Sequence, residues 1–145
     1  MVLDTNTVLD WLVFEDAGMA AVSAAVEEGA LAWLATARMR DELARTLDYR
    51  TLARWQPDSE RTLSTFDKHA RLLPEPAAAP QHLRCSDPDD QVFLDLALAH
   101  GARWLLTHDR ALLRLARRVR PLGLLIVPPR RWSLAEARAA QDTQA

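Results

Sequence analysis

Short apolar runs alternate with longer helix-like segments along this chain, and this alternation restricts the fold more than any other feature. The apolar runs lie at residues 2–3, 30–34, 104–106 and 122–127. Helix signals lie between and beyond them, at residues 7–14, 17–28, 37–47, 57–72, 86–99, 110–118 and from residue 133. The alternation predicts an α/β fold, a three-layer α/β/α sandwich around a central parallel sheet.

The segment 37–47 carries the clearest helix signals. Thr36 precedes it and is a residue type that caps helices. Its large apolar residues share one helical face, namely Met39, Leu43 and Leu47. The proline-rich stretch 74–80 cannot continue a helix or a central strand, so we expect a loop there.

Length and composition predict a single globular domain over residues 1–145. The chain has 145 residues, of which 49% are hydrophobic and 26% charged. The longest apolar runs fall short of the ~20 residues of a membrane helix, and no basic leader precedes the first run. Cys85 is the single cysteine and is expected to be inert. These features predict a cytoplasmic protein without a membrane partner.

Positive charge is concentrated in the last third of the chain. Residues 103–145 contain nine arginines and three acidic residues, a net charge of +6, which leaves −8 for the remainder. Arginine binds phosphates through planar, bidentate contacts, so this stretch is a candidate nucleic-acid surface. The alternative is a solvated helix face, because Arg110, Arg114 and Arg117 recur at helical spacing.

Two aspartates follow predicted strands directly or closely. Asp4 comes after the run 2–3, and Asp109 is the first acidic residue after the run 104–106. Ligands of open parallel sheets bind outside the carboxyl ends of the strands, so neighbouring strands would bring these carboxylates into one crevice. The alternative is that both residues cap the helices that follow them.

Glu42 borders the apolar face of the helix 37–47. It lies three residues after Met39 and one before Leu43, a position from which its side chain can point inward. The alternative for this residue is a surface position with an ion pair to Arg38 or Arg45.

A fourth acid, Asp90, lies at the start of the apolar helix that ends near residue 99. Asp87 is the expected cap of this helix, so Asp90 is alternatively the acidic half of a capping box. Negative charge at a helix N-terminus is favourable, so Asp87 and Asp89 have a structural explanation too.

Four carboxylates that face one another raise one another's pKa values unless a cation lies among them. Oxygen ligands without a nearby cage of His or Cys select Mg²⁺ or Mn²⁺ over zinc. Such a cation activates water and stabilises charge on a phosphate, so the cluster predicts phosphodiester hydrolysis.

These motifs together resemble a known family. Residues 2–6, Glu42, residues 87–97 and residues 105–109 are similar in order and separation to the motifs of PIN domains, in the branch that contains toxins of bacterial toxin–antitoxin pairs. The similarity extends over nearly the whole chain. It implies an α/β/α sandwich, an endoribonuclease that depends on Mg²⁺ or Mn²⁺, often a homodimer, and a small cognate antitoxin protein as partner.

The resemblance also implies roles for individual residues. The acids carried over as catalytic metal ligands are Asp4, Glu42, Asp90 and Asp109. Asp90 is preferred because it lies ten residues before His100, and Asp87 or Asp89 stays open as a residue that shares its role.

Asn6 and Thr107 match positions that would orient the metal-binding carboxylates. Arg110, Arg114 and His108 are the candidate contacts to an RNA substrate. His108 departs from the small or basic residue expected before the last aspartate, and an exposed bystander is the alternative for it.

The tryptophans divide into three groups by position. Trp33 and Trp104 lie within strand runs and are expected in the core, whereas Trp11 is a candidate for a dimer face. Trp55 and Trp132 are expected at the surface.

Two other functions remain alternatives. Aspartate-nucleophile phosphatases also place an aspartate after the first strand, but they need a second one where this chain has Asn6, and a lysine in the site. The sole lysine, Lys68, lies within a predicted helix. The second alternative is a non-catalytic module that binds RNA or protein on the same fold, against which the presence of all four acids argues.

Overall fold

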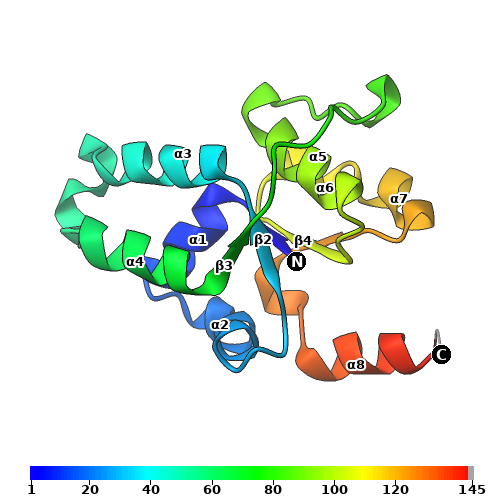
Figure 1. The fold of residues 1–145 in the computed structure, drawn as a ribbon, viewed down its shortest axis with the longest axis horizontal. Helices are drawn as coiled ribbons and strands as arrows, with labels where there is room; N and C mark the ends of the chain where they lie inside the picture. The colour runs from blue at the N-terminus through cyan, green and yellow to red at the C-terminus, as the bar shows by residue number, and fades with distance from the viewer. Residues whose placement is uncertain (144–145) are drawn as a thin grey trace.

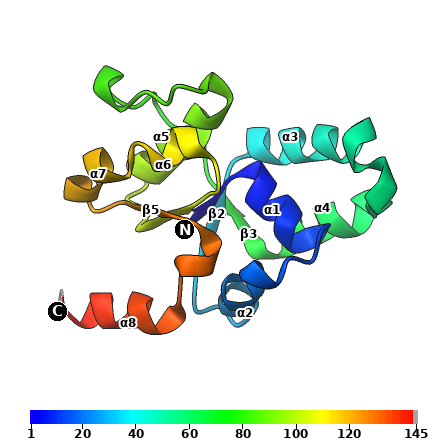
Figure 2. The same cartoon turned by 180° about the vertical axis from the view of Figure 1, so that it is seen from behind.

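Five parallel strands form the central sheet, in the order β3-β2-β1-β4-β5 (Figures 1 and 2). The computed structural model describes residues 1–143, so the last two residues of the predicted domain 1–145 lie outside the described part. The strands are β1 (Val2–Leu3), β2 (Trp33–Ala35), β3 (Ala70–Leu72), β4 (Trp104–Leu106) and β5 (Leu125–Val127). The predicted α/β fold with a parallel sheet is confirmed.

Helices lie on both sides of the sheet in both views (Figures 1 and 2). One side carries α1 (Thr5–Leu12), α2 (Ala20–Glu27), α3 (Ala37–Leu47) and α4 (Ser59–His69). The other side carries α5 (Gln91–Ala99), α6 (Arg110–Leu113) and α7 (Ala116–Val119). The last helix, α8 (Leu134–Asp142), packs near α2. Strand connections that return to a parallel sheet are right-handed, so the change of direction after β3 moves the later helices to the opposite face.

Short 3₁₀ turns connect several of these elements. They are η1 (Ala17–Met19), η2 (Arg50–Trp55), η3 (Gln81–Leu83), η4 (Pro88–Asp90), η5 (Arg120–Leu122) and η6 (Pro129–Arg131). Among the described residues, no helix has the length and apolarity that a membrane crossing requires.

The core lies where the short strands meet the apolar helix α5. Leu94 and Leu96 of α5 are fully buried, as are Val2, Leu105 and Leu106 of the two strands that α5 contacts. The burial explains why α5 is apolar on nearly all sides, since it packs on the sheet and is also covered. This packing fixes the N-terminal end of α5 next to the carboxyl ends of β1 and β4.

Helix α3 has the predicted bounds and the predicted cap. The Thr36 hydroxyl accepts a hydrogen bond from the backbone nitrogen of Met39 at 3.3 Å. Met39, Leu43 and Leu47 are all buried. Propensity, capping and apolar spacing agree here, which is why the sequence predicted the helix without error.

Three local predictions were wrong. The helix predicted to continue to residue 72 ends at His69, and the next three residues form the edge strand β3 beside β2. The helix predicted over 110–118 is divided into α6 and α7, because the chain tightens around Leu115, whose backbone nitrogen bonds to the Leu112 carbonyl at 3.0 Å. Trp132, expected at the surface, is only 2% exposed and packs edge-on against Trp104.

Candidate metal centre

The site lies at the point of the sheet where the strand order reverses. Chain connections run from β1 toward β2 on one side and from β4 toward β5 on the other, so β1 and β4 border a crevice at their carboxyl ends. Asp4 follows β1 and caps α1, and Asp109 caps α6 after β4. The capping function that the sequence allowed for both residues is therefore present, and it directs both carboxylates to one edge of the sheet.

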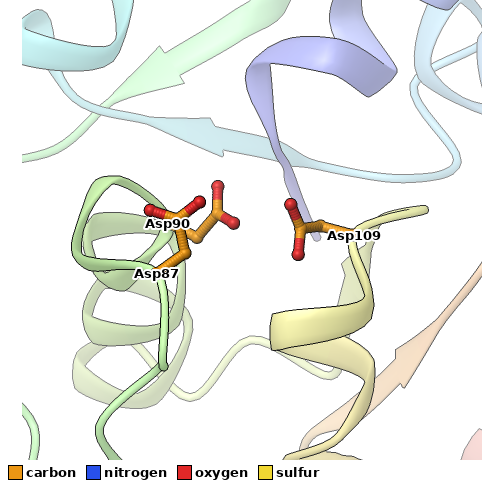
Figure 3. Close-up of side chains that lie close together, drawn as sticks. All are labelled: Asp87, Asp90 and Asp109. Carbon is orange, nitrogen blue, oxygen red and sulfur yellow. The ribbon is translucent and has the colours of Figure 1, made fainter.

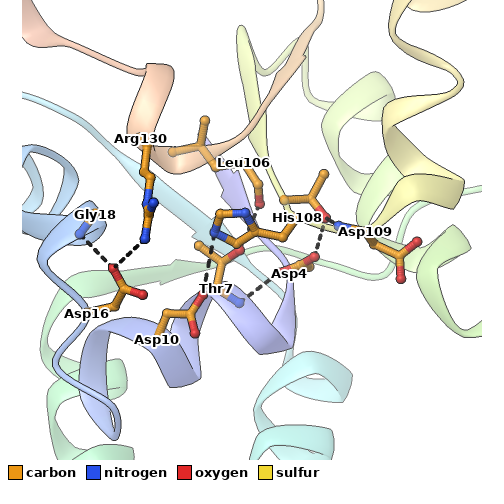
Figure 4. Close-up of polar contacts among 10 residues, drawn as sticks. Asp4, Thr7, Asp10, Asp16, Gly18, Leu106, His108, Asp109 and Arg130 are labelled. Carbon is orange, nitrogen blue, oxygen red and sulfur yellow. Dashed lines mark hydrogen bonds and ion pairs between the residues drawn. The ribbon is translucent and has the colours of Figure 1, made fainter.

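Asp4 is held by two threonines (Figure 4). One carboxylate oxygen accepts a hydrogen bond from the Thr7 backbone nitrogen at 2.8 Å, and the other accepts one from the Thr107 hydroxyl. Asp4 is 3% exposed, so burial raises its pKa, while the hydrogen bonds from Thr107 and Thr7 act in the opposite direction. These contacts fix the orientation of the carboxylate.

Thr107 links Asp4 to the last acidic residue of the site. Its hydroxyl oxygen also accepts a hydrogen bond from the Asp109 backbone nitrogen at 2.9 Å. The Asp109 carboxylate in turn accepts one from the Ala111 nitrogen at 2.7 Å. Thr107, which the sequence predicted to orient the carboxylates, therefore contacts both Asp4 and the backbone of Asp109.

Three carboxylates converge on one point (Figure 3). Asp87, Asp90 and Asp109 each offer an oxygen, and these three oxygens lie within 4.8 Å of one another. Asp90 ends the turn η4 before α5, Asp87 caps that turn, and Asp109 faces them from the cap of α6. The capping position of Asp87 brings it into the cluster, whereas Asp89, between the two, is exposed and lines the adjoining cavity. Asp87 thus lies in the cluster and Asp89 lines the neighbouring cavity, so which of the two shares the role of Asp90 stays a prediction.

Asp90 is the electrostatic centre of this group. Its Oδ2 atom is buried and has no hydrogen-bond partner among the described residues. Burial, together with the neighbouring Asp109, Asp87 and Asp4, raises the pKa of Asp90 from 3.8 to about 7. A buried carboxylate oxygen without a donor is costly, and a cation relieves that cost.

A cavity of about 380 Å³ connects the remaining predicted acid to this group. Asp4, Glu42 and Asp90 all line it, and so does Asn6. Glu42 is half-buried, and burial raises its pKa, while Arg45 opposes the rise. Asn6 is exposed at the cavity. The structure therefore brings all four predicted acids into one region, with Asp90 common to the cavity and the cluster.

Gln91, whose importance the sequence did not indicate, holds the loop before the cluster. Its side-chain oxygen accepts a hydrogen bond from the backbone nitrogen of Cys85, and its amide nitrogen donates to Asp95 at 2.8 Å. Cys85 is a free, buried thiol whose pKa is raised by burial, as expected for an inert cysteine. Asp95 also accepts from the backbone of Ala79, so it braces the loop 74–80. The sequence contains no signal for this role of Gln91, which shows only in the burial of its side chain in the folded structure.

The candidate substrate contacts lie beside the acids. Arg110 and Arg114 are exposed on and after α6. The imidazole of His108 is exposed and points to Asp10, at 3.6 Å, while the carboxylate of Asp109 points the other way (Figure 4). A role of these three side chains in RNA binding stays a prediction.

Comparison with known proteins gives the family. The family model of the PIN domain matches residues 1–111, about three quarters of the chain. The chain belongs to the PIN domain family. PIN domains are nucleases that generally depend on a metal, and the matched range includes every acid of this PIN domain's cluster and cavity. Searches among curated proteins and among solved structures gave no match.

Proposed function

We propose that this PIN domain is an endoribonuclease that hydrolyses RNA phosphodiester bonds with Mg²⁺ or Mn²⁺. The observation that carries the proposal is the buried, unpartnered Oδ2 of Asp90, which lies among the carboxylates of Asp87 and Asp109. Oxygen donors of this kind fit a hard divalent cation. All three described residues of the cluster are aspartates, without a histidine or cysteine among them.

Some of these residues would hold the cation, and others line the cavity. Asp87, Asp90 and Asp109 would hold the cation, and Asp4 would complete the site from a position fixed by Thr107. When bound, the cation supplies an activated water and stabilises charge on the phosphate.

Glu42 reaches the same cavity from α3. Its raised pKa suits a carboxylate that orients the attacking water through a hydrogen bond. Hydrolysis in this arrangement leaves a 5′-phosphate, as the family resemblance implies.

The experiment compares metal binding and RNA cleavage in the same proteins. Mg²⁺ or Mn²⁺ is expected to raise the melting temperature of the wild type, and Asp4→Asn and Asp109→Asn are expected to abolish both that rise and Mn²⁺-dependent RNA cleavage. Asp41→Asn removes an exposed carboxylate from α3 and serves as the control with the same change of charge. A wild type that binds the cation but cuts no RNA would favour the non-catalytic binding module instead.

We further propose that this nuclease is a toxin with a small antitoxin as inhibitor, that it acts in the cytoplasm and that it forms a homodimer. The support is the order of its acidic motifs, which resembles that of the toxin branch. Growth arrest on expression that disappears with Asp4→Asn, and a small reading frame for a DNA-binding protein next to the gene, would support the toxin role.

A further inference from the structure

The cavity that holds the acids also has an aromatic wall, which the hydrolysis of a phosphodiester does not require. Phe14 and Tyr49, with the aliphatic Leu52 beside them, line the same cavity of about 380 Å³ as the acids Asp4, Glu42, Asp89 and Asp90. Phe14 comes from the segment after α1, and the other two come from the connection after α3. The wall and the acids are therefore parts of one continuous surface.

Tyr49 is the most accessible part of this wall. The residue is 55% exposed, although tyrosine rings usually bury their apolar faces. It precedes η2, so its backbone position is set by the turn that also buries Leu52. An exposed ring at the edge of a cavity is available to a ligand.

Phe14 packs against a second aromatic ring, and a left-handed residue follows each of the two rings. Its ring packs against that of Trp55, with centroids 4.8 Å apart. Glu15 follows Phe14 and Gln56 follows Trp55, and these two residues have left-handed backbones, with φ of 51° and 44°. A left-handed residue other than glycine costs about 1–2 kcal/mol, and such strain is concentrated where a structure fixes a functional surface.

We propose that Tyr49 and Phe14 form a subsite that stacks on an unpaired base of single-stranded RNA, next to the phosphodiester that is cut. This inference rests on the proposed ribonuclease function. The acids repel the phosphates of RNA, so contact with a base offers binding free energy that does not depend on charge. Phe14 and Tyr49 line the same cavity as Asp4 and Asp90. A duplex, whose bases are stacked and paired, does not fit this subsite.

The experiment measures binding of RNA oligonucleotides by fluorescence anisotropy in an Asp90→Asn background, which prevents cleavage. Tyr49→Ala is expected to weaken binding of a single strand about 5- to 150-fold, the range for loss of one stacked base. Tyr49→Phe keeps the ring and is expected to bind as the parent does. Leu122→Ala, which removes another exposed apolar side chain, is the control outside the cavity. Replacing the bases by abasic sites is expected to remove the difference between Tyr49→Ala and its parent.

Three outcomes would overturn the inference, and they are distinguishable. If the parent binds RNA and the wild type cuts it, but Tyr49→Ala binds equally well, the stacking subsite is wrong and the ribonuclease proposal stands. If Tyr49→Ala weakens duplex binding or an antitoxin complex without an effect on single strands, the wall serves another partner. If the wild type neither binds nor cuts RNA, the ribonuclease proposal itself is wrong and the subsite with it.

Discussion

Replacement of Asp90 by asparagine is expected to stabilise the metal-free protein at neutral and alkaline pH. The Asp90 carboxyl carries a pKa of about 7 because of burial and the nearby Asp109, Asp87 and Asp4. An asparagine has the shape of the protonated acid and carries no charge at any pH. The variant therefore lacks the repulsion that the wild type develops when Asp90 ionises.

The magnitude follows from the two pKa values. A pKa raised from 3.8 to about 7 corresponds to at most about 4 kcal/mol, at about 1.4 kcal/mol for each unit. Asp90 is only half-buried, so solvent screening reduces this value, and we expect about 1–2 kcal/mol. In a domain of this length the gain corresponds to a melting temperature about 3–8 °C higher.

The difference in stability between Asp90→Asn and the wild type depends on pH. Between pH 3.8 and about pH 7 the folded state keeps the Asp90 proton that the unfolded state has released, so wild-type stability falls as pH rises through this window. Above that window the wild type has lost all of the stability that the Asp90 proton contributes. The advantage of Asp90→Asn is therefore expected to be largest near pH 8 and to shrink toward pH 4.

Urea denaturation in the presence of a chelator, followed by tryptophan fluorescence at several pH values, measures this difference. Asp41→Asn, with the same change of charge at an exposed position, is expected to show little effect at any pH. Excess Mn²⁺ is expected to reverse the order, because the wild type gains a bound ion that the variant does not hold. A variant less stable than the wild type at pH 8, or a difference independent of pH, would refute the electrostatic reasoning.

Three further outcomes follow from single contacts. Thr107→Val removes the hydroxyl that donates to Asp4, and is expected to cost about 1–3 kcal/mol of stability and to lower Mn²⁺ affinity about 10- to 100-fold, measured by denaturation and calorimetry. Gln91→Ala leaves a buried backbone nitrogen without its acceptor, and a loss of about 1–3 kcal/mol is expected by denaturation. Asp67→Asn breaks an exposed ion pair with Arg40, and it is this pair that lowers the pKa of Asp67 in the wild type. The substitution is expected to cost less than about 1 kcal/mol of stability at neutral pH, and the cost is expected to vanish as the pH falls through that lowered pKa, as denaturation at several pH values would show.

The sequence predicted those parts of the fold in which several local signals agree. Helix α3 has a cap and an apolar stripe, and β4 occupies the predicted residues 104–106. The edge strand β3 was missed because Ala70–Leu72 continues the apolar spacing of the preceding helix and is largely solvent-accessible. Its strand conformation comes from pairing with β2, a contact that local sequence does not contain.

The same distinction applies to the site. Asp4 and Asp109 were predictable because the carboxyl ends of parallel strands share one edge, and Glu42 because helical spacing placed it beside the buried face of α3. The choice among the acids at 87–90 depended on the direction of each side chain in the 3₁₀ turn η4, which spacing alone does not determine. The sequence could not predict the aromatic wall, because the wall is recognised by the exposure of Tyr49, and only a folded structure gives that exposure.

The hydrogen bond from Thr107 to Asp4 has a consequence for synthesis of the protein. It joins residues that lie 103 positions apart, across the pairing of β1 with β4. While the ribosome is still making the segment before β4, the first strand has no such neighbour and the acidic centre is incomplete. The site of the proposed nuclease can therefore form only after most of the chain has left the ribosome.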